Sequence, residues 1–334
     1  MSKDLRARIT GMGSYLPERV LSNQDLEKII DTSDEWITTR TGMKERRIAA
    51  EDEFSSDLAA KASKKALVDA RIDPKEIDFI LVATSTSDHI IPSTAALVQA
   101  KIGATNAAAM DIQAACTGYL YGLSVAKAYV ESGIYQNVLL IGAEKMSAFV
   151  DYQDRNTCIL FGDGASAAVV SSKGEGFAVD SICLGADGEL AELIIVPGGG
   201  SRNPTSIDTV SKRQHYFKMA GRETFKHAVR RMTSAAKECL EKAGLKEEQI
   251  SWLIPHQANL RIIYAMAKNF QIPAEKVGIT IHKYGNTSAS SLAITLDELT
   301  REQTINPGEH LLLVAFGAGL TWGASVLTKI EGDK

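Results

Sequence analysis

The chain has 334 residues, of which 45% are apolar and 23% charged, and its formal net charge is −4. This length indicates two domains or one large duplicated body of a globular protein. The mildly acidic balance argues against a general nucleic-acid binder, and no apolar run reaches the roughly 18 residues that a membrane span needs.

The start of the sequence, Met1-Ser2-Lys3-Asp4-Leu5-Arg6, lacks the apolar core of a secretion signal. The cysteines at 116, 158, 183 and 239 are scattered, without a C-x-x-C pair, which is typical of reduced thiols. The six histidines show no paired metal spacing. We therefore expect a cytoplasmic protein without a metal site.

In the first part of the chain, helical patterns alternate with short buried strands. Ser55 or Ser56 is placed to cap a helix that runs to about Arg71. Pro92 is expected to open the next helix, because proline suits the first helical turn. A third helix is predicted over residues 117–132, before a glycine.

The later part of the chain shows a similar order. The loosest stretch, residues 185–216, is predicted to cover a substrate entrance. A helix is then expected from about Glu223 to Gly244, another after Asn259, and a third after Thr287, each with apolar residues at helical spacing.

An internal repeat relates these two parts. Residues 77–80 match residues 250–253 at an offset of 250 − 77 = 173, and residue 139 matches residue 312 at the same offset (312 − 139 = 173). Nearly continuous apolar strands between helices imply sheets covered on both faces.

The repeat predicts two similar α/β halves, 1–174 and 175–334. The first half carries the cysteine that interests us most, and the second carries a histidine and an asparagine. Loops at strand ends are where α/β folds usually place their chemistry. We therefore expect one site at the junction of the halves.

Cys116 lies where an apolar stretch gives way to a helical run in Q-A-A-C-T-G. The helix dipole and unpaired N–H groups at such a position favour a thiolate by about 1 kcal/mol. A small buried hydrophobe is the alternative interpretation. Adding 173 to 116 gives Ala289, three residues from Asn286, so each half places a polar residue at the start of a helix.

His256 and Asn286 stand in the compact motifs P-H-Q-A-N and Y-G-N-T-S. A single histidine is often structural, but Gln257 and Asn259 are available to fix its tautomer. Asn286 suits a helix cap, or a neutral donor to a thioester oxygen. A poised cysteine with a distant histidine and asparagine indicates a covalent acyl-transfer enzyme.

These motifs, A-C-x-G, H-Q-A-N and G-N-T-S-A-S in this order, resemble those of the thiolase-like condensing enzymes, and within them β-ketoacyl-acyl-carrier-protein synthase III. The resemblance runs from Gly11 to Gly323. Elongating synthases differ by a second histidine where this chain has Asn286, and thiolases by a second cysteine near the C-terminus. The resemblance implies a five-layer αβαβα fold with two duplicated halves, assembled as a homodimer.

The resemblance also implies a mechanism that starts fatty-acid synthesis. Cys116 takes an acyl group from acyl-CoA, which is a substrate and not a cofactor. His256 and Asn286 then hold the thioester oxygen of malonyl-acyl carrier protein while CO₂ leaves. Backbone N–H groups at Cys116 and near Ala318 form an oxyanion hole, and Phe316 keeps water out.

Further residues are assigned by resemblance alone. Ile91 stands where an aromatic is frequent at the floor of the partner's acyl pocket, which leaves acetyl preference open. Ala318 replaces a common glycine, and Asn269 replaces a basic residue near the carrier site. Trp36 also suits a plain hydrophobic anchor, and the basic residues a solvated face. The CoA site would comprise Thr32, Trp36, Arg40 and Arg155, with the adenine between Trp36 and Arg155, and the carrier-protein surface Lys226, Arg261 and Lys268.

Three other functions remain open at this point. The first is a condensing enzyme of specialised metabolism that uses a longer acyl donor. The second is a non-catalytic thiolase-like subunit, against which the presence of Cys116, His256 and Asn286 argues. The third is a cysteine hydrolase, which would release free acid without malonyl.

Overall fold

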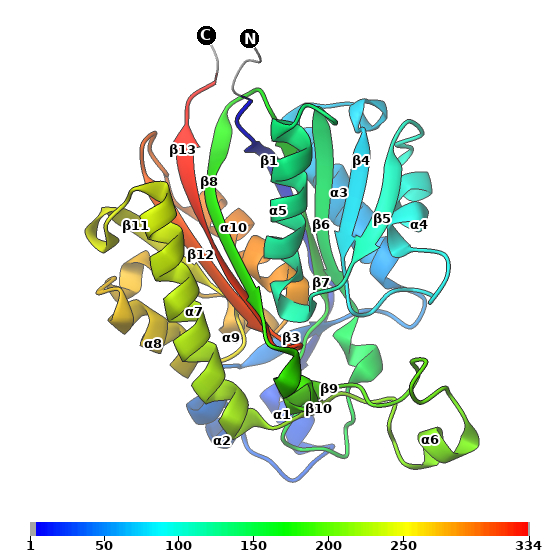
Figure 1. Cartoon of the computed structure of the whole chain (residues 1–334). Coiled ribbons are helices and arrows are strands. Elements are labelled where there is room, and N and C mark those ends of the chain that lie inside the picture. Colours follow the sequence, from blue (N-terminus) through cyan, green and yellow to red (C-terminus); the bar gives the residue numbers. More distant parts are fainter. Residues whose placement is uncertain (1–4, 333–334) are drawn as a thin grey trace.

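The computed structural model describes residues 5–332, so the first four residues of the segment compared with a secretion signal lie outside it. Within this range the chain forms strands and helices in alternation (Figure 1). The strands are β1 Arg8–Tyr15, β2 Arg19–Ser22, β3 Glu45–Ile48, β4 Phe79–Ala83, β5 Ala108–Ile112, β6 Asn137–Glu144, β7 Gly164–Ser171, β8 Gly176–Ala186, β9 Ile194–Ile195, β10 Lys218–Met219, β11 Ile250–Pro255, β12 His310–Gly317 and β13 Thr321–Ile330. The helices are α1 Asn23–Glu27, α2 Asp34–Thr41, α3 Ser55–Ala70, α4 Thr94–Ile102, α5 Gly118–Glu131, α6 Ile207–Ser211, α7 Gly221–Ala243, α8 Leu260–Asn269, α9 Ile281–Tyr284 and α10 Ser291–Glu302.

The strand pairing repeats itself on either side of a central junction. Nine strands follow the order β11-β12-β13-β8-β1-β7-β6-β4-β5. On one side β4 runs parallel to β5 and β6, while β6–β7 and β7–β1 are antiparallel. On the other side β11 runs parallel to β12, and β12–β13 and β13–β8 are antiparallel. A parallel bridge between Leu253 and Val277 stands where β5 stands in the first half.

The helices divide into an inner pair and two outer groups. Helices α3 and α4 pack on β1, β4–β7, and helices α7 and α8 pack on β8 and β11–β13. Between them, α5 contacts strands β4 and β6 of the first half and strands β8 and β13 of the second. Helix α10 likewise contacts β1 and β7 as well as β11 and β12. The succession is therefore helix, sheet, helix, sheet, helix (Figure 1).

Most predicted helices are confirmed, but two of their starts in the first half differ. The first is capped by Phe54 and not by a serine, because the Asp57 carboxylate accepts the Phe54 N–H at 3.0 Å. Ser55 instead donates its hydroxyl to the Thr86 carbonyl at 2.5 Å. The prediction that Pro92 opens a helix is wrong. Helix α4 begins at Thr94, after Ser93 as its cap.

In the second half the predicted starts of α7 and α8 hold within two residues, whereas α10 begins three residues later than predicted (291 − 288 = 3). Helix α7 ends at Gly244, whose φ of 69° lies in the left-handed region that glycine tolerates. Helix α8 begins after Asn259, whose side-chain oxygen accepts the Arg261 N–H at 2.9 Å. Helix α10 follows a short 3-10 turn, Ser288–Ser290.

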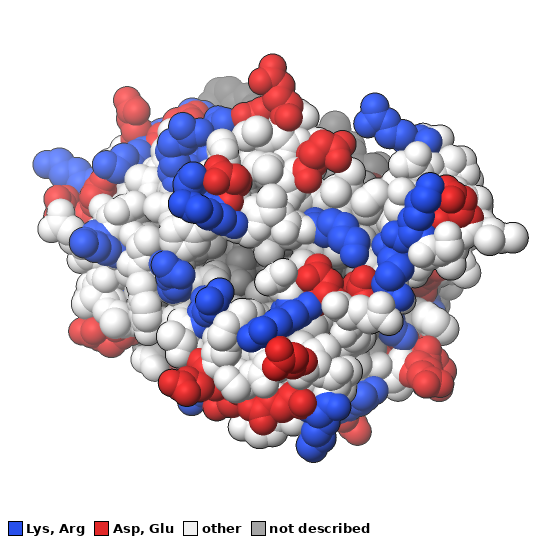
Figure 2. Space-filling model, turned by 90° about the horizontal axis from the view of Figure 1, so that it is seen from below, with Lys and Arg blue, Asp and Glu red and all other residues white. Residues whose placement is uncertain are grey.

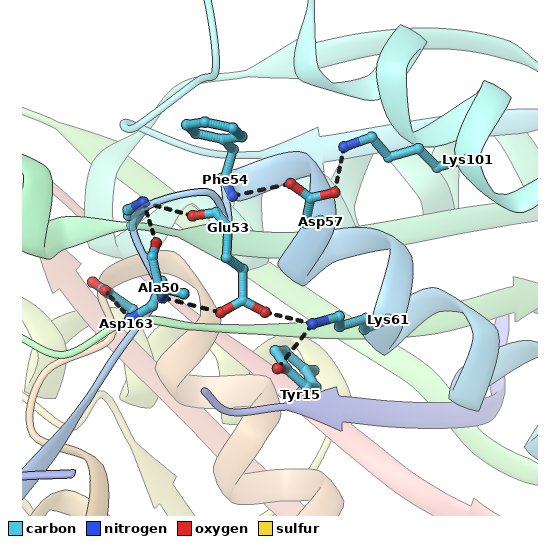
Figure 3. Close-up of polar contacts among 10 residues, drawn as sticks. Tyr15, Ala50, Glu53, Phe54, Asp57, Lys61, Lys101 and Asp163 are labelled. Carbon is cyan, nitrogen blue, oxygen red and sulfur yellow. Dashed lines mark hydrogen bonds and ion pairs between the residues drawn. The ribbon is translucent and has the colours of Figure 1, made fainter. Parts of the chain in front are cut away.

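A polar network attaches the loop before α3 to the end of β6. The Glu53 carboxylate binds Lys61 at 2.5 Å, and the Lys61 ammonium also reaches the Tyr15 hydroxyl at 3.0 Å (Figure 3). The ammonium of Lys145 donates to the carbonyls of Ala50 and Glu53 at 2.8 and 2.6 Å. These contacts hold Lys145, the residue that follows β6. They thereby hold the end of β6, which faces the site described next.

Candidate active site

Cys116 lies in a 3-10 turn, Ala115–Thr117, between β5 and the start of α5. Ala115 has a φ of 47°, a left-handed conformation that is uncommon for a residue with a Cβ. Gly317, at the end of β12, packs against this turn, and a Cβ added there would lie 2.8 Å from the Cys116 nitrogen. The second half therefore holds the backbone of the first-half cysteine in place.

A matching turn precedes α10. Ser288 has a φ of 50°, and its number is that of Ala115 plus the repeat offset (115 + 173 = 288). The two 3-10 turns contact each other. The expectation that the two helix starts face one another at the junction of the halves is thus met by the backbone.

Burial dominates the acidity of Cys116. It raises the pKa of the thiol, and with a smaller contribution from the negative charge of Glu144 the pKa reaches about 12, although hydrogen bonds from Ser288 and Asn286 act in the opposite direction. This effect of burial opposes the ~1 kcal/mol that a helix dipole contributes toward the thiolate. Burial therefore favours the protonated thiol, in opposition to the helix start, which favours the thiolate.

His256 follows β11 and is 3% exposed. Its backbone N–H donates to the Val314 carbonyl at 2.8 Å, and its Nδ1 lies 2.6 Å from the Ser291 hydroxyl. Burial lowers the pKa of His256 to about 4, so the ring is neutral at physiological pH. Because Nδ1 is engaged, Nε2 is the nitrogen left for a ligand.

Gln257 and Asn259, which were expected to fix the histidine tautomer, bind other groups instead. The Gln257 amide donates to the Pro255 carbonyl at 2.6 Å and accepts the Thr280 N–H at 2.9 Å. Asn259 caps α8 and donates to the Arg40 carbonyl at 3.0 Å. That part of the prediction is wrong, since Ser291 orients the ring.

Asn286 orders the turn that follows it and also offers a side-chain donor. Its Oδ1 accepts the Ser288 N–H at 2.8 Å, which leaves the Nδ2 group for another partner. Its backbone pairs with the segment around Phe161, where the Asn286 N–H donates to the Leu160 carbonyl at 2.9 Å. The interpretation as a helix cap is wrong, because Thr287 precedes the 3-10 turn and Ser290 precedes α10 as their caps.

These groups line one cavity of about 660 Å³. It is walled largely by apolar side chains, including Phe161, Phe217 and Met219. Part of the predicted entrance segment, Ile194, also lines it. Of the residues singled out from the sequence, those on its wall are Cys116, His256, Asn286, Phe316, Trp36, Arg40, Lys226 and Arg261.

The guanidinium groups of Arg40 and Arg155 both lie over the Trp36 ring. The Arg40 and Arg155 carbons lie 4.5 and 4.2 Å from its ring centroid. Arg155 also lies 3.9 Å from Asp31, and the Thr32 hydroxyl is buried without a hydrogen-bond partner among the described residues. A base stacked between Trp36 and Arg155 would have to displace the guanidinium.

Five predicted residues do not line the cavity, namely Thr32, Arg155, Ile91, Lys268 and Ala318. Ile91 is 86% exposed, and Lys268 lies exposed on α8. Ala318 is partly buried, has a negative φ, and accepts the Thr321 hydroxyl at 2.9 Å through its carbonyl.

Sequence reasoning missed Glu144, Ser288 and Ser291. The repeat offset relates Ser288 to Ala115, beside Cys116, and could have identified it. Glu144, in contrast, looks in the sequence like the end of an ordinary buried strand. Among residues 5–332, no three His, Cys, Asp or Glu side chains are grouped to hold a metal. No helix in the same range has the length and apolar character to cross a bilayer.

Comparisons with known proteins agree with this geometry. Residues 110–188 match the family model of 3-oxoacyl-[acyl-carrier-protein] synthase III, and residues 240–329 match the model of its C-terminal part. Beta-ketoacyl-[acyl-carrier-protein] synthase III of Chlamydia caviae is 58% identical over 99% of both chains. The enzyme of that name from Caldanaerobacter subterraneus is 54% identical over 98% of this chain and 99% of its own.

Solved structures show the same fold. The 3-oxoacyl-[acyl-carrier-protein] synthase III of Aquifex aeolicus is 49% identical with a TM-score of 0.89, covering 96% of this chain and 99% of its own. That of Pseudomonas aeruginosa is 38% identical with a TM-score of 0.89, covering 98% and 100%. The fold is accordingly thiolase-like. The chain belongs to the 3-oxoacyl-[acyl-carrier-protein] synthase III family.

Proposed function

We propose that this enzyme condenses a short acyl-CoA, acetyl-CoA in the first instance, with malonyl-acyl carrier protein. The products are 3-oxoacyl-acyl carrier protein, CoA and CO₂, and the reaction initiates fatty-acid synthesis. The observation that carries the proposal is that Cys116, His256 and Asn286 line one cavity.

The first step is transfer of the acyl group to Cys116. The sulfur forms a bond with the thioester carbon, the bond from that carbon to the CoA sulfur breaks, and the proton of the thiol ends on CoA. Backbone N–H groups at Cys116 and Ala318 would face the oxyanion, with Gly317 between them at the end of β12.

The second step is decarboxylation of the malonyl group. Neutral His256 donates through Nε2 when Ser291 donates to Nδ1, and Asn286 donates through Nδ2. Both hydrogen bonds strengthen as the thioester oxygen gains negative charge, which stabilises the enolate. The enolate carbon then forms a bond with the acyl carbon, the bond from that carbon to the Cys116 sulfur breaks, and the sulfur takes up a proton from water to restore the thiol.

Two surfaces would hold the substrates. Thr32, Trp36, Arg40 and Arg155 are proposed to bind the CoA adenine, with Arg155 moving off the indole to admit the base. Lys226 and Arg261 stand at the cavity rim, where basic side chains flank a hollow in the surface (Figure 2). Together with Lys268 they are proposed to receive the acidic carrier protein.

We further propose a homodimer that acts in the cytoplasm without a resident cofactor. Strand β5 ends the nine-stranded order and is only half-buried. Nearby, Ile90 and Ile91 are 89% and 86% exposed, an apolar pair that a second copy would cover. In that arrangement Ile91 would reach the partner's acyl pocket.

The test is transfer of label from radiolabelled acetyl-CoA. Cys116→Ala should abolish it, and persistent labelling of the folded variant would contradict the proposal. Replacing His256 or Asn286 should slow malonyl decarboxylation more than acylation. A panel of acyl-CoAs fixes the chain length and separates this function from a condensing enzyme that uses longer donors, which the relatives do not favour.

A further inference from the structure

Glu144, the last residue of β6, is a fully buried carboxyl that the steps above do not use. Its oxygens accept the Thr86 hydroxyl at 2.7 Å and the Ser85 N–H at 3.1 Å. They also accept the Ser288 hydroxyl at 3.0 Å and the Ala289 N–H. Two of these donors are backbone groups that cannot reverse their direction, which favours the carboxylate. Burial acts against it and raises the pKa of Glu144 to about 7, so the group carries its charge above that pH.

Ser288 connects this carboxylate to two reacting groups. Its N–H donates to Asn286 Oδ1 at 2.8 Å, and its 3-10 turn contacts the turn that carries Cys116. Its φ of 50° is a conformation that persists only where the surroundings hold it. Ser288 is held from the other side of the junction, because Glu144 belongs to the first half and Ser288 to the second.

The charged neighbourhood of Glu144 is simple. Cys116 is the titratable group that responds to its charge. Lys145 follows it in the chain, but its ammonium binds the carbonyls of Ala50 and Glu53. The His256 ring is held by a different residue of the second half, Ser291.

We propose that Glu144 is a positioning residue that acts through Ser288, whose hydroxyl and turn it holds so that Asn286 and Cys116 face one substrate. A hydroxyl has a single proton. While that proton is given to Glu144, it is not available to a thiolate at Cys116. The carboxylate thus orders the site and at the same time disfavours an unpaired thiolate.

This double role predicts opposite effects of two variants on Cys116. Glu144→Gln removes the negative charge and frees the serine proton, so alkylation of Cys116 by iodoacetamide at pH 8 should accelerate by about tenfold, one pKa unit. Ser288→Ala removes the hydroxyl whose proton Glu144 accepts, so the carboxylate charge near Cys116 is less compensated and alkylation should slow by about tenfold. Peptide mass spectrometry assigns the label to Cys116, apart from the buried cysteines.

Both variants should slow malonyl decarboxylation by about ten- to a hundredfold, because the Asn286 turn loses its anchor. That effect rests on the proposed function, whereas the alkylation rates do not. The matched control is Asp163→Asn, a fully buried carboxylate that accepts the Ser147 hydroxyl at 2.6 Å and the Ala49 N–H at 2.8 Å. It should leave alkylation of Cys116 unchanged.

The outcomes separate cleanly. Opposite shifts in alkylation support the proposal, and shifts in the same direction, or rates equal to those of Asp163→Asn, overturn it. If Glu144→Gln does not fold, Ser288→Ala decides alone, since Glu144 keeps its Thr86 and Ser85 donors: slower alkylation supports the proposal and an unchanged rate overturns it. A wild-type enzyme that fails to decarboxylate malonyl groups while the alkylation shifts hold would refute the function and not the role of Glu144.

Discussion

Gly317→Ala should slow acylation although it replaces none of the three reacting side chains. The new Cβ would lie 2.8 Å from the Cys116 nitrogen, and 3.2 Å from both the Cys116 Cβ and the Thr117 nitrogen. Ordinary contact begins at 3.4 Å, so the cysteine backbone or β12 must move by 0.6 Å (3.4 − 2.8). Overpacking of this kind lowers the free energy of unfolding by about 1–3 kcal/mol.

The catalytic cost follows from the same displacement. A misplacement of about 1 Å costs roughly a hundredfold, so we expect acylation of Cys116 to slow by about ten- to a hundredfold. The assay is the intact mass of the protein during a time course with acetyl-CoA. Gly188→Ala is the control, because a Cβ there meets nothing within 4 Å. Acylation of folded Gly317→Ala at the wild-type rate would refute this reasoning.

Three further predictions concern titration and binding. Burial depresses the pKa of His256 from 6.5 to about 4, so the unfolded chain gains a proton between these values that the folded chain does not. Stability should fall as the pH drops from 6.5 to 4, by about 3 kcal/mol in total, and urea denaturation should show that His256→Gln loses this component; equal slopes in both proteins would contradict it. Trp36→Ala should raise the KM for acetyl-CoA about tenfold but leave acylation by acetyl-pantetheine, which lacks adenine, unchanged; equal losses with both donors would remove Trp36 from the adenine site. Lys226→Glu combined with Arg261→Glu should raise the KM for malonyl-acyl carrier protein at low salt, and the effect should shrink as salt is added; a salt-independent change would indicate damage to the cavity.

Much of this architecture could be predicted because the signals were local or periodic. Helix faces and caps such as Gly244 and Asn259 depend on nearby residues, and the offset of 173 residues needs only counting. The helix starts at Phe54 and Thr94 escaped prediction because a carboxylate three residues on, or a serine beside the proline, competed for the cap. The division of the chain at residues 174 and 175 stays a prediction.

The site was predicted as a set of residues, but its internal connections were not. Ser291 lies 35 residues from His256 in the sequence, and Glu144 lies 144 residues from Ser288, so only the folded chain brings each pair together. The effect of burial on the acidity of Cys116 was likewise not visible in the sequence. A sequence shows that a helix begins near a thiol, but not how completely the thiol is enclosed.

The inner position of α5 and α10 has a consequence for how this chain unfolds. Each of these helices rests on strands from both repeats, and one apolar cluster contains Leu120 and Leu123 from α5 with Leu292 and Leu296 from α10. Separating the repeats would strip both helices of half their packing and expose that cluster to water. Although the gene looks doubled, the product should melt in one cooperative transition, and a fragment ending between β7 and β8 should not persist as a folded unit.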